Sequence, residues 1–234
     1  MKQFIKTFET PEKYIVTHTS PDWDAIAAAW LLHCFVDPAM PVKFISAGDA
    51  SGSGLMEKAY AVVDVGGVYD PAHGLFDHHV KGQEDTCATL QVAESLSQER
   101  DLSYLQPLLD MINLIDHGVA DDKQTGLWAI MAGMPGADID KLSCGWAILD
   151  ALETNLSRRK QAREELAGKT VYRSADNQLV AIKHGSRQCT DMAFEQGARV
   201  VMFERASRYR RTPGRHTRSV CSATPGERFL IWAR

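Results

Sequence analysis

Four short segments in the first half of the 234-residue chain carry the side chains that commonly bind metal ions. Residues 18–24 (HTSPDWD) contain one histidine and two aspartates, and residues 77–79 (DHH) contain one aspartate and two histidines. Asp64 follows the apolar run at 61–63, and Asp116 ends a predicted helix. Carboxylates accompanied by a few imidazoles suit Mn²⁺ or Mg²⁺ better than thiophilic metals. The segments therefore predict a site for divalent cations.

Alternating apolar runs predict the elements that must position these side chains. Three strands and three helices are expected, at residues 14–17, 42–45 and 61–65 and at residues 25–32, 86–96 and 102–117. Strands that alternate with helices indicate a parallel sheet with helices on both faces. Ligands of such sheets bind beyond the carboxyl ends of the strands, which is where His18 and Asp64 fall.

Each aspartate also has a plain structural interpretation. Asp22 and Asp24 stand at the start of a predicted helix, where they would serve as caps. Asp116 would be an ordinary residue at a helix end, although an acid there is mildly unfavourable without a compensating cation. Asp64 is harder to explain, because a carboxylate beside a buried strand is costly unless it is paired or binds a metal. His78 and His79 would otherwise be surface histidines in a loop.

The order of these motifs resembles that of the DHH phosphoesterase superfamily. The shared features are His-x-x-Pro-Asp-x-Asp, a strand that ends in Asp, Asp-His-His and a later Asp at a helix end, and they cover residues 14–118. Residues 63–71 (VDVGGVYDP), 76–79 (FDHH) and 115–119 (IDHGV) are similar to a branch of RNA exonucleases once described as metal-dependent protein hydrolases. The first motif follows the pattern of the superfamily at large rather than that of the branch.

The resemblance implies a fold, two metal ions and a set of ligands. It implies a DHH catalytic domain that holds two Mn²⁺ ions, with Mg²⁺ as the other candidate. The ligands implied for the first ion are His18, Asp22 and Asp64. Those implied for the second ion are Asp24, Asp64, His78 and Asp116. Catalytic roles fall to Asp64 as the bridging ligand, to His79 facing the phosphate and to Asp77 orienting a histidine, with activated water in place of a Ser or Cys nucleophile.

The second half of the chain has the opposite charge and suggests a substrate-binding role. Residues 1–156 hold 9 Lys/Arg against 23 Asp/Glu, and residues 157–234 hold 17 against 7. Arginine side chains match the geometry of phosphate, and helix starts bind anions. The candidate substrate-binding residues are His184, Arg187, Arg215, His216 and Arg218. A solvated basic loop, or two lobes that attract each other, would explain the same charges.

The pattern as a whole predicts an α/β protein with a larger catalytic part and a smaller basic part. The expected division is a metal-binding domain at 1–138, a connecting helix at 139–169 and a small α/β substrate-binding domain at 170–234. No stretch reaches the roughly 20 apolar residues that a membrane span needs. Five cysteines, an odd number with none two residues apart, favour reduced thiols and a cytoplasmic protein.

The leading functional hypothesis is a Mn²⁺-dependent phosphoesterase that cleaves phosphodiester bonds in short single-stranded oligonucleotides or nucleotides. The alternatives are a pyrophosphatase or other phosphatase of a small phosphorylated molecule, and a catalytically silent nucleotide-binding module. The expected partners are therefore phosphorylated small molecules or short nucleic acids, with no membrane. The sequence leaves the oligomeric state open, a dimer included.

Overall fold

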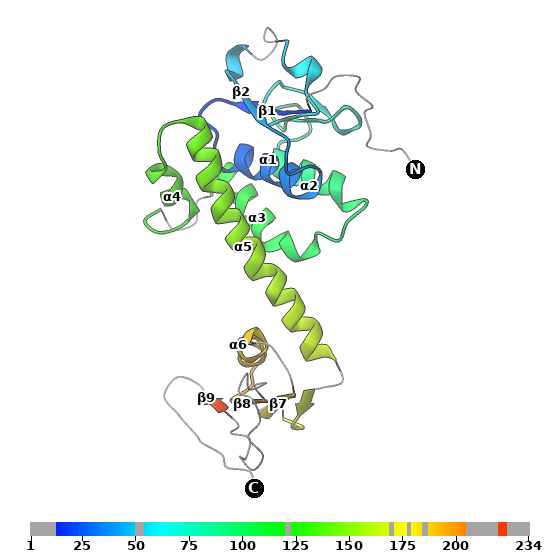
Figure 1. The fold of residues 1–234 in the computed structure, drawn as a ribbon, viewed down its shortest axis with the longest axis vertical. Helices are drawn as coiled ribbons and strands as arrows, with labels where there is room; N and C mark the ends of the chain where they lie inside the picture. The colour runs from blue at the N-terminus through cyan, green and yellow to red at the C-terminus, as the bar shows by residue number, and fades with distance from the viewer. Residues whose placement is uncertain are drawn as a thin grey trace. The chain divides into compact units, whose positions relative to one another are not determined.

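The computed structural model divides the chain into two compact units, residues 1–153 and 154–234, and each is described by itself (Figure 1). The structure describes residues 13–49, 54–119, 123–168, 171–176, 179–183, 187–204 and 220–223. The boundary between the units falls inside one long helix, α5 (Asp138–Ala167). The three-part division expected from the sequence remains an expectation.

A five-stranded, mostly parallel sheet forms the centre of the first unit. Its strands are β1 (Ile15–His18), β2 (Val42–Ile45), β3 (Ala61–Val63), β4 (Tyr69–Asp70) and β5 (Leu75–Phe76), in the spatial order β2-β1-β3-β5-β4. All neighbours pair in parallel except β4, which runs antiparallel at the edge. The predicted α/β fold with a parallel sheet flanked by helices is thus confirmed.

Four complete helices and the first half of α5 accompany the sheet. The four are α1 (Trp23–Phe35), α2 (Ala88–Ser97), α3 (Gln106–Asp116) and α4 (Leu127–Gly133). Figure 1 shows α1 and α2 below β1 and β2. Every residue from Trp23 to Leu32 of α1 is buried, which suits a helix that is apolar on all sides and surrounded by other elements. The Trp30 indole Nε1 donates a hydrogen bond of 2.8 Å to Asp150 Oδ1 and so ties α1 to α5.

The other face of the strands carries a second apolar cluster. Val16 and Val62 alternate with residues that point to the opposite face of the sheet, and they pack with Tyr14 and Ile45. The segment around the short 3₁₀ helix Met56–Lys58 covers this cluster, since Met56 packs against it. The sheet is therefore buried on both faces, and its polar groups are left to the strand ends.

The second unit contains a smaller sheet in the order β6-β7-β8-β9, in which β7 and β8 pair in parallel and the outer pairs are antiparallel. Its elements are β6 (Val171–Arg173), β7 (Leu179–Lys183), α6 (Arg187–Glu195), β8 (Val200–Glu204) and β9 (Val220–Ala223), with the second half of α5. The core includes Ala162 and Leu166 of α5 and Met192 of α6.

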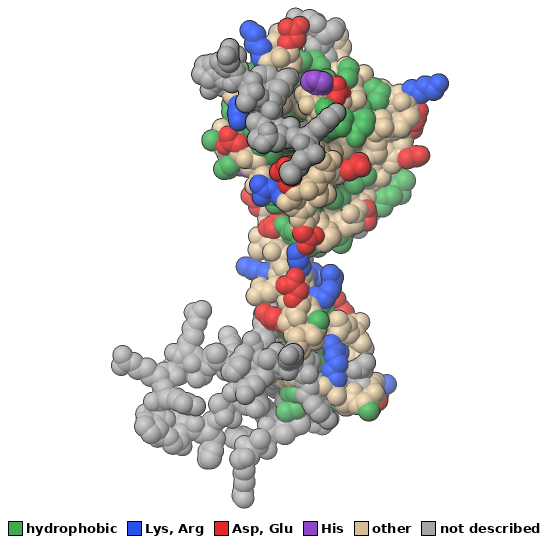
Figure 2. All heavy atoms as spheres, turned by 90° about the vertical axis from the view of Figure 1, so that its right-hand side faces the viewer, with side chains coloured by type: hydrophobic (Ala, Val, Ile, Leu, Met, Phe, Trp, Pro, Cys, Tyr) green, Lys and Arg blue, Asp and Glu red, His purple; other side chains and the backbone are tan. Residues whose placement is uncertain are grey.

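The middle of α5 is polar. Lys, Arg, Asp and Glu side chains of both signs are interspersed on the face shown in Figure 2. Arg159 forms a two-pronged ion pair with Glu195, with N–O distances of 3.0 and 2.6 Å. Within the described part of the chain, no helix is both long and apolar enough to cross a membrane.

Candidate metal centre

The centre of the site is Asp64, directly after β3. Its φ of +55° lies in the left-handed region, which few residues other than glycine adopt. The backbone N–H of Asp64 donates to the carbonyl of Phe76 on the neighbouring strand at 2.8 Å, and this contact helps to fix the turn. Its Oδ2 lies 3.1 Å from His18 Nε2, at the end of β1. Strained backbone of this kind often marks functional sites, because the surrounding structure must hold it in place.

His18 is oriented from its other ring nitrogen. Its Nδ1 donates to the carbonyl oxygen of Thr19 at 2.8 Å. Such an outer hydrogen bond fixes the tautomer and turns Nε2 toward the site, as in histidines that bind metals. The nearest oxygen of Asp22 lies 4.0 Å from the same Nε2. His18, Asp22 and Asp64 therefore form one group of three donors whose atoms lie within 4.8 Å of one another.

A second group of donors surrounds His78. Its Nε2 lies 3.5 Å from an oxygen of Asp64, 3.5 Å from one of Asp116 and 3.8 Å from one of Asp24. Asp24, His78 and Asp116 form a second group of three, and Asp64, His78 and His79 form a third. The structure thus brings together all six side chains that the sequence singles out as metal ligands, with Asp64 between the groups.

The capping interpretation holds for Asp22, whereas Asp24 caps another helix, α2, instead of α1. Asp22 is the N-cap of α1, and its Oδ1 accepts from the backbone N–H groups of Asp24 and Ala25 at 3.0 and 3.1 Å. Asp24 is buried, and its two oxygens accept from the N–H groups of Ala88 and Thr89 at the start of α2, both at 2.7 Å. Each carboxylate oxygen has two lone pairs, so capping and metal binding are compatible.

Asp77 holds His79 and a glycine turn in one arrangement. Its Oδ2 accepts from the backbone N–H of Gly67 at 2.6 Å. Its Oδ1 lies 3.0 Å from the backbone nitrogen of His79 and 2.9 Å from His79 Nδ1. Asp77 is buried, whereas 66% of the His79 side chain is exposed. The ring is therefore anchored on one side, and Nε2 is the ring atom available to a ligand.

A polar groove of about 560 Å³ opens beside these groups. Its wall includes the glycine turn at 66–67, His18, His79 and the carboxylates of Asp64 and Asp116. Because these two glycines have no side chain, a ligand can approach the backbone of the turn closely. We call this hollow the polar groove.

The closely spaced carboxylates change the pKa values of the histidines in the site. Burial alone would lower the pKa of His18, but its hydrogen bonds to Asp64 and to the carbonyl of Thr19 raise it to about 9. The contact with Asp64 is the largest effect on His78 and raises its pKa to about 9 as well. Burial opposes ionisation of Asp64, yet the two histidines lower its pKa overall. In the metal-free protein, the two imidazolium ions therefore offset part of the carboxylate charge.

Two buried atoms indicate that a cation fits here. Asp64 Oδ1 and His78 Nε2 are both buried without a hydrogen-bond partner among the described residues, and they face each other at 3.5 Å. Buried polar atoms are normally satisfied, so a pair of unsatisfied ones calls for an explanation. A divalent cation supplies one, because carboxylate and neutral imidazole are both suitable donors for Mn²⁺ or Mg²⁺.

Metal binding must displace protons from this site. Both imidazoles are charged at neutral pH in the free protein, and they must lose a proton to bind a cation. Burial also raises the pKa of Asp24 to about 7, so this ligand is partly protonated at pH 7. We therefore expect about two to three protons to be released per chain near pH 7. The affinity for Mn²⁺ should rise about tenfold per proton released for each pH unit between about pH 6 and about pH 8. Calorimetric titration in buffers of different ionisation heat measures this number. An affinity that stays flat over that range contradicts the assignment.

The strand order and the distances between the donor atoms define an α/β protein with carboxylate and imidazole donors clustered at the carboxyl ends of β1 and β3. Residues 15–200 match the MYG1_exonuc family, described as an uncharacterised protein family (UPF0160), and the chain belongs to this family. The match agrees with the narrower of the two sequence resemblances, that to the RNA-exonuclease branch. The wider relation to the DHH superfamily remains a proposal.

A solved structure that the chain matches is that of a pGpG-specific phosphodiesterase, PggH from Vibrio cholerae. The two chains are 15% identical in sequence, with a TM-score of 0.36 over 83% of this chain and 77% of that one. No curated protein sequence matches the chain.

The candidate substrate-binding residues of the second unit are not placed by the structure. His184, Arg215, His216 and Arg218 lie outside the described residues, and Arg187 begins α6 with its side chain outside them as well. Their roles therefore remain predictions.

The sequence interpretation missed His117, which follows Asp116. The Nδ1 of His117 lies 2.8 Å from the carbonyl of Asn113 and its Nε2 2.7 Å from that of Glu84. These two carbonyls raise the pKa of His117, and its Nδ1 lies 3.7 Å from Asp116. The run Asp116-His117-Gly118 was the available signal, but the partner carbonyl of Glu84 lies 33 residues away and could not be read from it.

Proposed function

We propose that this protein is a metal-dependent phosphoesterase that hydrolyses phosphodiester bonds in short oligonucleotides or nucleotides with two divalent ions, Mn²⁺ in preference to Mg²⁺. The observation that carries the proposal is the pair of three-donor groups joined by Asp64. The name of the family, which refers to an exonuclease, supports the same class of reaction. We also propose that the first unit is a catalytic domain of the DHH type.

The donor groups suggest how the ions would be held. His18, Asp22 and Asp64 would hold one ion, and Asp24, His78 and Asp116 would hold the other together with the second oxygen of Asp64. Two ions in one site activate water and stabilise the leaving oxygen in phosphoryl transfer. Hydrogen bonds from α1 and α2 keep Asp22 and Asp24 in place before any ion arrives.

The remaining residues act on the substrate itself. His79, anchored by Asp77, presents Nε2 to a phosphate oxygen in the polar groove. The N–H of Gly67 is already donated to Asp77, so the glycine turn contributes shape rather than that donor. The basic residues of the second unit, among them Arg215, His216 and Arg218, would bind further phosphates of the substrate.

Activity assays test the proposal: purified protein is first freed of metal, and each metal ion and each substrate is then added in turn. We expect Mn²⁺ to support shortening of a labelled single-stranded pentaribonucleotide and hydrolysis of the dinucleotide pApA, with weaker activity in Mg²⁺ and none in chelator. Release of phosphate from pyrophosphate without cleavage of either oligonucleotide would instead identify a small-molecule phosphatase. Nucleotide binding with no turnover in any metal would identify a silent binding module.

A further inference from the structure

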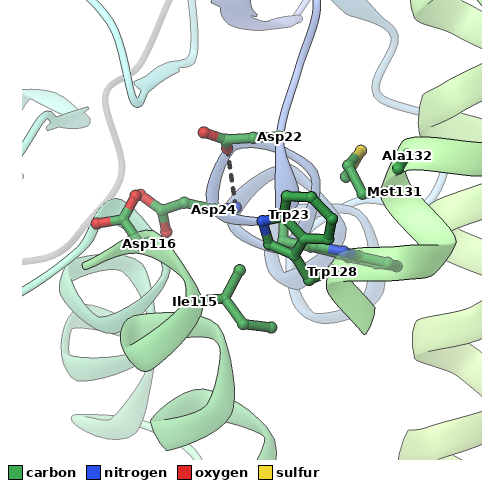
Figure 3. A pocket seen from close by; sticks show the side chains of 8 residues that line it. All are labelled: Asp22, Trp23, Asp24, Ile115, Asp116, Trp128, Met131 and Ala132. Atoms are coloured by element: carbon green, nitrogen blue, oxygen red, sulfur yellow. Dashed lines mark hydrogen bonds between the residues drawn. The ribbon is translucent and has the colours of Figure 1, made fainter. Parts of the chain in front are cut away.

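A second hollow adjoins the same carboxylates and has a different character. It has a volume of about 310 Å³. Its lining consists of Asp22, Trp23, Asp24, Ile115, Asp116, Trp128, Met131 and Ala132. Figure 3 shows the three carboxylates together at one side and the two tryptophans, Ile115, Met131 and Ala132 making up the rest of the wall. We call this hollow the apolar pocket.

The apolar wall is built by a regular face of α4. Trp128, Met131 and Ala132 are spaced i, i+3 and i+4, so they lie on one side of the helix. The indole Nε1 of Trp23 donates to the carbonyl of Leu127 at 2.7 Å and thereby ties the start of α1 to the start of α4. Trp23 is 2% exposed, whereas Trp128 is 44% exposed. Trp23 is therefore held in place, whereas Trp128 is partly exposed and has the Lys123 ammonium 5.7 Å from its ring centroid, so a base would stack on the rest of its ring.

The metal groups lie between the two hollows. Asp22 and Asp116 line both the polar groove and the apolar pocket. A phosphodiester bound at the metal groups would therefore have the polar groove beside one of its substituents and the apolar pocket beside the other. The polar groove offers His79 and the glycine turn, which suit phosphate and sugar oxygens.

We infer that the apolar pocket is a subsite for a nucleobase attached next to the scissile phosphate, an inference that rests on the proposed phosphodiesterase function. Aromatic side chains bind bases by stacking, and every base has a face to stack. The rest of the wall is apolar and aromatic, so an uncharged flat group is the favoured occupant. At about 310 Å³, the pocket is at the lower end of the range for small-molecule sites.

The side chains that line the apolar pocket also determine which substrates the subsite accepts. Ile115, Met131 and Ala132 have no hydrogen-bonding side-chain groups, and the indole N–H of Trp23 is already donated to Leu127. Stacking without edge contacts discriminates little between bases. The apolar part of the wall therefore favours substrates that carry a base, and a preference among bases would have to come from the carboxylates of Asp22, Asp24 and Asp116.

Binding measurements with adenosine monophosphate and ribose 5-phosphate test the subsite without relying on turnover. The full chain is titrated with each compound in the presence of Mn²⁺. We expect the base to strengthen binding about 5- to 100-fold. Trp128→Ala should remove most of this advantage, and Trp128→Phe should retain part of it. Ile130→Ala is the matched control, because Ile130 is an exposed residue of the same helix that does not line the pocket.

The outcomes separate the subsite from the proposed function. Equal affinity of the two compounds for the wild-type protein, or an advantage of the base that survives Trp128→Ala, overturns the subsite. If the advantage depends on Trp128 but no phosphodiester is hydrolysed, the subsite stands and the proposed function fails. If pApA is hydrolysed and its abasic analogue is hydrolysed equally well, the function stands and the subsite fails.

Discussion

Asp64→Asn should lower the metal-dependent hydrolysis of pApA about 10³-fold or more, since it removes the one carboxylate that belongs to two of the three donor groups. Asparagine has the same size and also tolerates the left-handed backbone at this position, so the change adds little strain. Alanine would lack both advantages. The loss should appear mainly in kcat and in the amount of Mn²⁺ needed, because an amide is a weaker ligand than a carboxylate.

Steady-state kinetics over a series of Mn²⁺ concentrations measures this loss, and circular dichroism shows whether the fold is kept. Asp70→Asn is the matched control, since Asp70 is a nearby aspartate on β4 that pairs with the exposed His73 and belongs to none of the donor groups. That variant should keep activity within about twofold of wild type. Wild-type activity in Asp64→Asn would reject the bridging role of Asp64.

His78→Ala should destabilise the metal-free protein by about 2–3 kcal/mol at pH 7. The imidazolium of His78 lies among three carboxylates, and its pKa is raised from 6.5 to about 9 in the folded protein. A raised pKa of this kind gives stability that is fully present below about pH 6.5 and is lost as the pH rises through about 9. The difference between variant and wild type should therefore shrink toward pH 9 and above.

Urea unfolding in chelator at several pH values measures this effect on the free energy of unfolding. His73→Ala is the control, because His73 pairs with Asp70 at 2.6 Å but both side chains are largely exposed. Exposed pairs contribute at most about 1 kcal/mol. A destabilisation by His78→Ala that does not change with pH would mean that its charge is not what holds the carboxylates together.

The positions of the donor residues could be predicted because strand ends can be recognised in a sequence. The apolar runs before His18 and Asp64 indicate buried strands, and neighbouring parallel strands bring their carboxyl ends to the same edge. Predicting the position of Asp116 required only the amphipathic pattern of α3, which places this residue in the last turn of the helix. Each of these inferences depends on local pattern alone.

The contacts that join distant segments could not be predicted in the same way. The hydrogen bonds from Ala88 and Thr89 to Asp24 span 64 and 65 residues, and nothing in either segment indicates the partner. The strands β4 and β5 have two residues each and are too short to show a period. Helix α4 has only 7 residues and was not predicted, so the apolar pocket that it forms was missed too.

A crystal structure of the protein soaked with Mn²⁺, with anomalous scattering recorded at the manganese edge, would show whether Asp64 joins two metal ions. We expect two peaks about 3.5–4 Å apart. One should be bound by His18 and Asp22 and the other by His78 and Asp116, with Asp64 reaching both. The absence of manganese from this cluster at saturating concentration, or a single ion that leaves His78 and Asp116 without a metal, would contradict it.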